Sequence, residues 1–433
     1  MHAARPRTAL LAWLVWAIGV SAYLVAFFHR VALNVAAGET AERLDVSTAA
    51  LGVFAFLQIG TYLAMQLPAG FAADRLGPRR TLALGLLAIS AGEVIFALAH
   101  TLPVAVGGRA LVGAGDAMTF VNVLRLVQNW FPEHRQALLA ALTGVVGGAG
   151  SLAATIPLDA SLREVGWYGT FGIAAGVALV LAGVTYAVVR DRPRGVPAPA
   201  AHEHDPVGRA IAAAWRRPTT RRAFLAHAGT LGPFAAIGTI WGVPYLEHAH
   251  GVDGTTAASL MLATGIAFTA CVPLVGLTGH WPPRARAALL IVPAALQVAA
   301  LVGLLVWPGA AAPRALVIAM LALVGLNAAV SVSCFDIARI SAPRSTVGMT
   351  VAIVNCGGFT AAAIGSVVIG LWLGGDPSAT RVEHAVLGVT LAITAIGFAG
   401  STRLTAELAA ARQRAAALQP SQTPATPAAR ASS

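Results

Sequence analysis

The sequence predicts an all-α membrane protein with twelve transmembrane helices in two six-helix halves. Of its 433 residues 57% are apolar, and the mean hydropathy is +0.74. Such a composition would give a soluble domain an aggregating surface. Apolar runs long enough to cross a bilayer recur along the chain. Arginines concentrate in alternate loops between these runs, as they do in multi-pass membrane proteins.

Twelve apolar runs reach the length of about 20 residues that a transmembrane helix needs. The predicted spans are residues 9–36, 47–69, 81–100, 104–128, 136–158, 167–189, 223–246, 255–277, 286–307, 313–337, 346–373 and 383–402. The first run is long enough to span and lacks a convincing cleavage site, so no cleavable signal peptide is expected.

A polar stretch rich in Arg, Pro and Ala divides the chain. It covers residues 190–222 and is predicted to be a cytoplasmic linker between an N-terminal half, 1–189, and a C-terminal half, 223–403. Residues 404–433 are rich in Ala, Pro, Gln, Ser and Thr. Because this composition offers little apolar surface to bury, we expect a disordered cytoplasmic tail.

The loops on the two sides of the membrane differ in charge. One side has acidic or mixed loops, for example Glu39 to Asp45 and Glu247 to Asp253. The other side is biased to arginine, in the linker and at Arg5, Arg7, Arg75, Arg79, Arg80, Arg135, Arg284, Arg286, Arg339 and Arg344. The positive-inside rule therefore predicts a multi-pass protein of the inner membrane with both termini cytoplasmic.

The turn after the second span gathers charge in a chain with only 11% charged residues. It reads Gly70-Phe-Ala-Ala-Asp74-Arg75-Leu-Gly77-Pro-Arg79-Arg80. A degenerate copy starts 206 residues later, at Gly276, and has lost the Asp-Arg pair. Two related helical halves around a site at the midplane are typical of secondary transporters.

These motifs resemble those of the major facilitator superfamily over about residues 9–402. The turn matches the family signature G-x-x-x-D-R-x-G-x-R-R at Gly70, Asp74, Arg75, Gly77, Arg79 and Arg80. Arg109-x-x-x-Gly113-x-Gly115 resembles the motif of the fourth helix. The resemblance implies the major facilitator fold and rocking-type alternating access.

The first span is similar to one branch of that family. Its segment from Phe27 to Ala36 resembles anion:cation symporters and organophosphate permeases, in which an arginine faces the central cavity. Asn355-Cys-Gly-Gly-Phe359 and the glycine-rich fifth span resemble the nitrate/nitrite permeases, but spans 47–69 and 255–277 lack the arginines that nitrate transport relies on there. The fifth span also lacks the Gly-Pro pair of drug exporters.

Charged residues inside spans cost about 2.5 kcal/mol or more, so each needs a partner or a purpose. Arg30 is predicted to bind an anion, because its planar fork suits carboxylate or phosphate; the alternatives are snorkelling to the outer interface and a structural ion pair. Arg109 and Asp116 lie seven residues apart on one helix face and are candidates for proton coupling or for a packing pair. Glu93 is expected to be a packing glutamate.

Aromatic and amide side chains on the spans expected to line the cavity are candidates for substrate binding. Each amide has the alternative of bonding a neighbouring helix. They are Tyr23, Phe27, Gln58, Tyr62, Asn122, Trp241, Tyr245, Asn327 and Asn355, together with Arg30.

The charged turn is predicted to act as a gate. Asp74 is expected to lie against the positive N-terminus of another helix or against an arginine, and to hold the cytoplasmic side shut. Opening would break this contact and bias a two-state equilibrium by about 1–3 kcal/mol. The alternative is an ordinary charged loop end.

The sequence predicts neither an enzyme nor a cofactor or metal site. It lacks a phosphate-binding Gly-Lys-Ser/Thr loop, and Cys271, Cys334 and Cys356 all fall in apolar runs. The expected function is proton-coupled transport of a small organic or inorganic anion by a monomer, with protons and the lipid bilayer as its other partners and no role for nucleic acid. The alternatives are an exporter of drugs or other amphipathic solutes, and a non-transporting sensor of the same fold.

Overall fold

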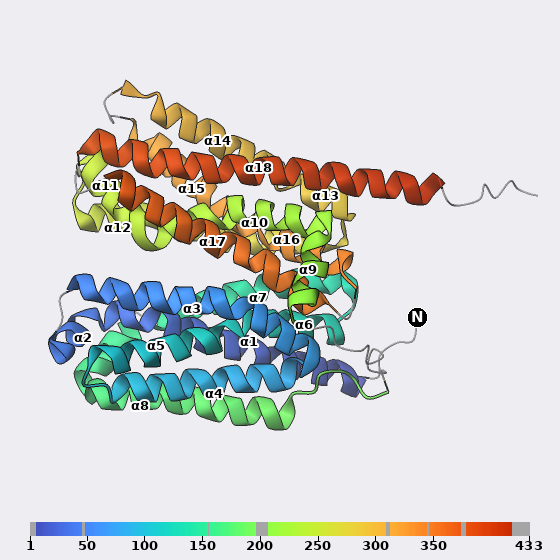
Figure 1. Ribbon diagram of the computed structural model, residues 1–433, viewed down its shortest axis with the longest axis horizontal. Helices are drawn as coiled ribbons and strands as arrows, with labels where there is room; N and C mark the ends of the chain where they lie inside the picture. Colours follow the sequence, from blue (N-terminus) through green and yellow to red (C-terminus); the bar gives the residue numbers. More distant parts are fainter. Residues whose placement is uncertain are drawn as a thin grey trace, which may run out of the picture.

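The computed structural model describes residues 6–45, 48–154, 156–195, 207–308, 312–343, 346–373 and 378–417. Every regular element in these ranges is helical. Figure 1 shows two layers of roughly parallel helices, α1 to α8 in one and α10 to α18 in the other. The described part of the chain therefore has the all-α architecture that the sequence predicts.

The six predicted spans of the first half fall on helices in the same order. These are α1 (Pro6–Val35), α3 (Thr48–Arg75), α4 (Pro78–Ala97), α5 (Leu102–Ala117) with α6 (Phe120–Trp130), α7 (Glu133–Ala153) and α8 (Ile156–Val188). The short α2 (Ala37–Leu44) follows α1. Gly166, with φ 74°, interrupts α8 one residue before the predicted sixth span begins. Glycine adopts this left-handed conformation without the steric penalty of a Cβ atom.

The second half repeats the pattern. Its helices are α10 (Pro218–Ala236) with the π-helical turn Ile237–Trp241 and α11 (Gly242–His250), α12 (Gly254–Leu277) with the 3₁₀ turn Thr278–His280, α13 (Pro283–Ala288) with α14 (Ile291–Leu305), α15 (Arg314–Val330) with α16 (Val332–Ser341), α17 (Val347–Leu373) and α18 (Ala379–Ala417). Nine helices or helix pairs of the described residues are long and apolar enough to span a membrane. The other three predicted spans fall on α3, α7 and α10 to α11.

Helices extend past two predicted boundaries within the described residues. The stretch 190–222 contains a helix, α9 (Val207–Arg216), and α10 already begins at Pro218. Proline suits the first turn of a helix because that turn leaves its N–H groups without intrahelical partners. The predicted tail is helical from 404 to Ala417, since its alanines favour helix strongly; residues 418–433 lie outside the described part.

The two halves meet along two seams. One joins α3 to α17, and the other joins α7 to α12. Small residues allow the close approach: a Cβ on Gly70 would lie 2.7 Å from the Cβ of Ala352, and one on Gly276 would lie 2.8 Å from that of Ala141. We call the end of the bundle that carries the Gly70–Arg80 turn the motif end; α1 begins and α18 ends there (Figure 1).

Candidate functional site

An ion pair lies in the interior of the first half. Arg30 of α1 donates from Nε to Asp116 Oδ2 at 2.7 Å and from Nη2 to Asp116 Oδ1 at 2.9 Å. The Arg30 side chain is 16% exposed and that of Asp116 is 1% exposed. Asp116 lies near the middle of the span that α5 and α6 form together, so the pair is deep within the membrane-spanning region. Its bidentate geometry matches the planar guanidinium to a carboxylate.

Aromatic rings surround the guanidinium of Arg30. Its Cζ lies 4.4 Å from the ring centroid of Phe27, 4.7 Å from that of Tyr62 and 5.9 Å from that of Phe359. Tyr23 stacks edge-on against Phe27. The faces of these rings are negative and favour a cation, so they help to hold the guanidinium in place.

The second half completes this arrangement. Asn355 of α17 donates from Nδ2 to the Tyr62 hydroxyl at 3.1 Å and to Gln66 Oε1 at 2.9 Å. The ring of Phe359, also on α17, lies 4.8 Å from that of Tyr62. Helices of both halves therefore meet around Arg30, and a change in their relative position changes the surroundings of its guanidinium.

A second buried network lies beside the first. Arg109, fully buried on α5, donates to Glu93 Oε2 at 3.1 Å, to Gln58 Oε1 at 2.8 Å from Nη2 and at 3.0 Å from Nε, and to the His29 carbonyl at 2.5 Å. His29 Nδ1 lies 3.0 Å from Glu93 Oε2. Arg109 thus bonds Glu93 and Gln58, while Asp116 bonds Arg30. The expected packing role of Glu93 agrees with these contacts, and Gln58 belongs to this network.

The structure does not group every predicted site residue. Five of them come together around the ion pair of Arg30 with Asp116: Arg30 itself, Tyr23, Phe27, Tyr62 and Asn355. Gln58 bonds Arg109 instead, and the remaining four lie elsewhere: Asn122 donates to the Met118 carbonyl of the preceding turn, Tyr245 shares a hydrogen bond with His250, Asn327 donates to Gln297, and Trp241 lies in the π-helical turn. Asn122, Tyr245 and Asn327 are fully buried.

Sequence reasoning missed several contributors. His29, Gln66, Phe359 and Arg125 were not singled out as site residues. His29 adjoins Arg30, and Gln66 follows Tyr62 by one helical turn, so both were within reach of periodicity arguments. Phe359 ends the glycine-rich Asn355–Phe359 motif and Arg125 is a charge inside an apolar run, but neither signal indicates the partner, which lies on another helix.

Asp74 lies between the two halves at the motif end. Its carboxylate accepts hydrogen bonds from the backbone N–H groups of Gly348 and Met349, each at 3.1 Å, and forms an ion pair with Arg125 of α6. These N–H groups belong to the first turn of α17, where the helix dipole favours a negative charge. Asp74 therefore joins the first half to the second.

The rest of the turn braces the first half. Gly77 has φ 82°, which suits glycine, and leads directly into α4. The N–H of Arg79 donates to Asp191 Oδ1 at 2.7 Å, and Arg79 Nε donates to the Tyr186 carbonyl at 2.7 Å. Arg75 lies over the Phe71 ring at 4.1 Å, and Arg80 is exposed.

The degenerate copy keeps an ion pair in altered form. Arg286, the counterpart of Arg80, donates to Asp336 Oδ2 at 3.3 Å, and Arg339 donates to Asp336 Oδ1 at 2.9 Å. The acid comes from α16 and not from the turn itself. Although the sequence of the copy lacks the Asp-Arg pair, its arginine still forms an ion pair in the structure.

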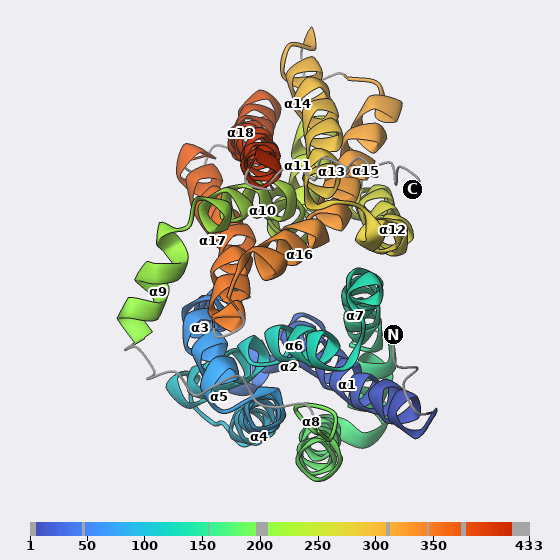
Figure 2. The same ribbon diagram turned by 90° about the vertical axis from the view of Figure 1, so that its right-hand side faces the viewer.

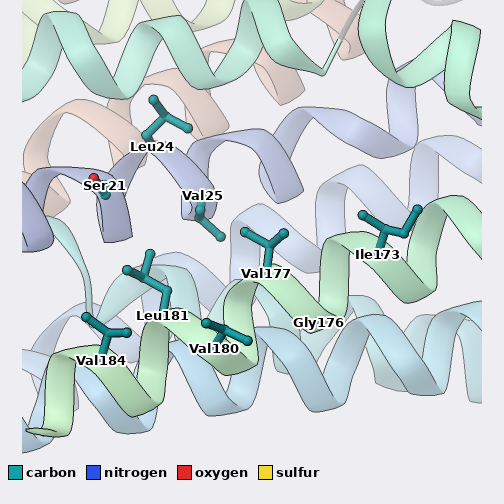
Figure 3. A pocket seen from close by; sticks show the side chains of 9 residues that line it. All are labelled: Ser21, Leu24, Val25, Ile173, Gly176, Val177, Val180, Leu181 and Val184. Atoms are coloured by element: carbon teal, nitrogen blue, oxygen red, sulfur yellow. The ribbon is translucent and has the colours of Figure 1, made fainter.

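A groove of about 590 Å³ lies between α1 and α8 (Figure 3). Its lining is apolar apart from Ser21, whose hydroxyl donates to the Ala17 carbonyl. Val177 and Val180, on its α8 wall, are 50% and 67% exposed. Exposed apolar side chains on a spanning helix face lipid, so this groove is unsuited to an anion.

The sequence model of the Major Facilitator Superfamily matches residues 19–366. The chain therefore belongs to this family.

Among characterised relatives, the chain is similar to the D-galactonate transporter of Escherichia coli O6:H1, with 27% identity over 36% of this chain and 36% of that protein. It is also similar to the hexuronate transporter of Bacillus subtilis, with 26% identity over 40% of each. The matches thus span about two-fifths of the length of these relatives.

Solved structures share the fold over nearly the whole chain. The proton:xylose symporter XylE has a TM-score of 0.68 at 12% identity, covering 90% of this chain and 95% of that one. The transporter FucP in the outward conformation has a TM-score of 0.68 at 14% identity, covering 91% and 99%. At these identities the likeness concerns the fold.

Proposed function

We propose that the protein is a proton-coupled transporter of small organic anions, with sugar acids as the favoured class. The paired, aromatic-walled guanidinium of Arg30 carries this proposal. Relatives named as D-galactonate and hexuronate transporters support the choice of sugar acids. Sugar acids carry a carboxylate, which is the group through which Asp116 binds Arg30.

The pair explains how anion and proton binding are linked. Both nitrogens of Arg30 that face Asp116 are engaged by its carboxylate, so an anionic substrate must compete with Asp116 for them. Protonation of Asp116 removes the competing charge and frees the fork of Arg30. A substrate carboxylate then replaces the carboxylate of Asp116, and proton and anion occupy the site together. This order of events gives symport of the two.

Alternating access follows from the seams between the halves. In the present conformation Asp74 holds the N-terminus of α17 at the motif end, and Asn355 and Phe359 of α17 contact Tyr62 near the site. Rotation of the halves would break the contacts of Asp74 and, through α17, alter the surroundings of Arg30. The gate and the anion site thus share one helix.

The arginine bias of the motif end supports its assignment to the cytoplasm. Both chain ends and the linker then lie on the cytoplasmic side of a bacterial-type inner membrane, and the transporter acts as a monomer with one site between its halves. An exporter of amphipathic solutes is the second candidate, favoured by the aromatic rings of Phe27, Tyr62 and Phe359. In that case Arg30 would be dispensable.

The test is the Arg30→Lys variant in reconstituted vesicles, with uptake of D-galactonate, D-glucarate and tartrate. Lysine keeps the charge but loses the bidentate fork, and each hydrogen bond between charged groups contributes about 1.5–3 kcal/mol. We expect uptake efficiency to fall about 10- to 100-fold.

Arg314→Lys, at the start of α15, is the matched control and should keep wild-type uptake. Equal uptake by Arg30→Lys and wild type for every transported substrate would refute Arg30 as the anion site. Full accumulation after collapse of the proton gradient and membrane potential would refute proton coupling.

A further inference from the structure

The helix α9, between the two halves, lies across the spanning helices. Figure 1 shows it running roughly perpendicular to them near the motif end, and Figure 2 shows it at the outer edge of the bundle beside α3 and α17. Its ten residues, Val207–Arg216, precede α10 directly. A short helix in this orientation is typical of the membrane–water interface.

The apolar face of α9 covers the seam between the halves. Ala214 is buried, and Ala210 and Ile211 are partly buried in the same cluster. Their partners are Leu67 and Phe71 of α3 together with Met349 and Ile353 of α17. One helix face thus packs on both halves, next to Met349, whose backbone N–H donates a hydrogen bond to Asp74.

The contacts of α9 fix its depth. Phe71 lies in the last two turns of α3 and Met349 in the first turn of α17, so α9 sits at the level where the spanning helices end. Arg217, directly after α9, donates to the Thr346 hydroxyl just before α17 at 3.2 Å. This level is the lipid headgroup region.

The opposite face of α9 is basic and exposed. Arg209 and Arg216 are seven residues apart, which places them two turns apart on one face, and Ala212 and Ala213 between them are exposed. Trp215, on the flank, is 42% exposed and packs edge-on against Phe224 at 5.2 Å. Indole rings favour the interface, and arginines there attract anionic headgroups.

We propose that α9 binds the headgroups of anionic phospholipids through Arg209 and Arg216 while its apolar face clamps α3 to α17. Anionic lipid holds the helix at the interface and so stabilises the conformation in which the motif end is closed. The inference goes beyond the proposed function, since it depends neither on the substrate nor on protons. It gives the linker helix a binding role of its own.

The binding test uses native mass spectrometry of the full-length protein in detergent, titrated with phosphatidylglycerol. An arginine near an anionic surface contributes about fivefold to binding, so the double variant Arg209→Gln/Arg216→Gln should retain the lipid about 25-fold more weakly. Phosphatidylcholine should show no such difference. Arg284→Gln, exposed on α13, is the matched control and should behave as wild type. Equal retention by the double variant and wild type, or equal loss in Arg284→Gln, would overturn the proposal.

The clamp is tested by hydrogen–deuterium exchange in vesicles with and without phosphatidylglycerol. In the wild type the lipid should slow exchange in segments 67–75 and 346–353, and the double variant should lose this effect. Ile211→Ser should speed exchange in both segments while lipid retention stays unchanged, whereas Ala212→Ser on the exposed face should not. Unchanged exchange in Ile211→Ser, or the same increase in Ala212→Ser, would show that α9 does not clamp the seam.

Discussion

Replacing Asp116 by asparagine separates the two roles proposed for the Arg30–Asp116 pair. The amide has almost the shape of the carboxylate, but it carries no charge and takes up no proton at physiological pH. If Asp116 is the proton site and the competitor of the substrate, Asp116→Asn should bind anions without needing a proton. It should also lose the ability to accumulate them against a gradient.

The size of the effect follows from the geometry. The carboxylate accepts two charge-assisted hydrogen bonds from Arg30, at 2.7 Å and 2.9 Å. Bonds to a charged group contribute about 1.5–3 kcal/mol each, and an amide has one oxygen to offer, so the substitution removes about one such bond. Weakening the competitor by about 1.5–3 kcal/mol tightens anion binding about 10- to 150-fold at neutral pH.

The assay is thermal stabilisation of the purified protein by D-galactonate, D-glucarate and tartrate over a pH series. Binding to the wild type should tighten as the pH falls, because protonation of Asp116 frees Arg30. Binding to Asp116→Asn should be tight and independent of pH, while proton-driven uptake into vesicles is lost and exchange of labelled substrate persists.

Asp336→Asn is the matched control. It neutralises another buried acid, which pairs with Arg286 and Arg339, and it should leave the pH dependence of binding unchanged. The reasoning is refuted if binding to Asp116→Asn still tightens at low pH by the wild-type factor.

Two further predictions concern packing. Gly70→Ala should disfavour closure of the motif end by about 1–3 kcal/mol, because its Cβ would lie 2.9 Å from the Gly348 carbonyl. The labelling of a cysteine introduced near the motif end should then be faster. Gly60→Ala, which has open space around it, should leave the labelling rate unchanged. Glu93→Gln should shorten the half-life at raised temperature, because losing one partner of the buried pair with Arg109 costs about 3–5 kcal/mol. A wild-type half-life would show that Arg109 does not depend on Glu93.

Much of the fold could be predicted from the sequence because the bilayer imposes a strict length and hydrophobicity on each span. The breaks that divide one predicted span into two helices were harder to predict. The interruption between α5 and α6, near Met118 and Thr119, falls inside a continuous apolar run. The helix at 207–216 was hidden because arginine and alanine in a polar stretch indicate both a linker and an amphipathic helix.

The candidate site was predictable in part. Arg30 and Asp116 stand out, because any charge inside an apolar run is costly enough to attract notice. Their pairing does not follow from the sequence, since Asp116 shares a helix face with Arg109 and only the packing of α1 against α5 assigns it to Arg30. Asn327 and Tyr245 illustrate the opposite case, because a polar residue in a span has the same sequence signal whether it bonds a neighbouring helix or faces a cavity.

The sequence by itself determined the class of protein, the order of the spans and the charged turn with Asp74. These depend on local properties: the hydrophobicity of each run, the charge of each loop and the spacing within one motif. Only the tertiary structure decided that Asp74 reaches the first turn of α17 and that α9 crosses the seam between the halves. Such contacts join residues hundreds of positions apart, and their partners are selected by helix packing, which no local pattern encodes.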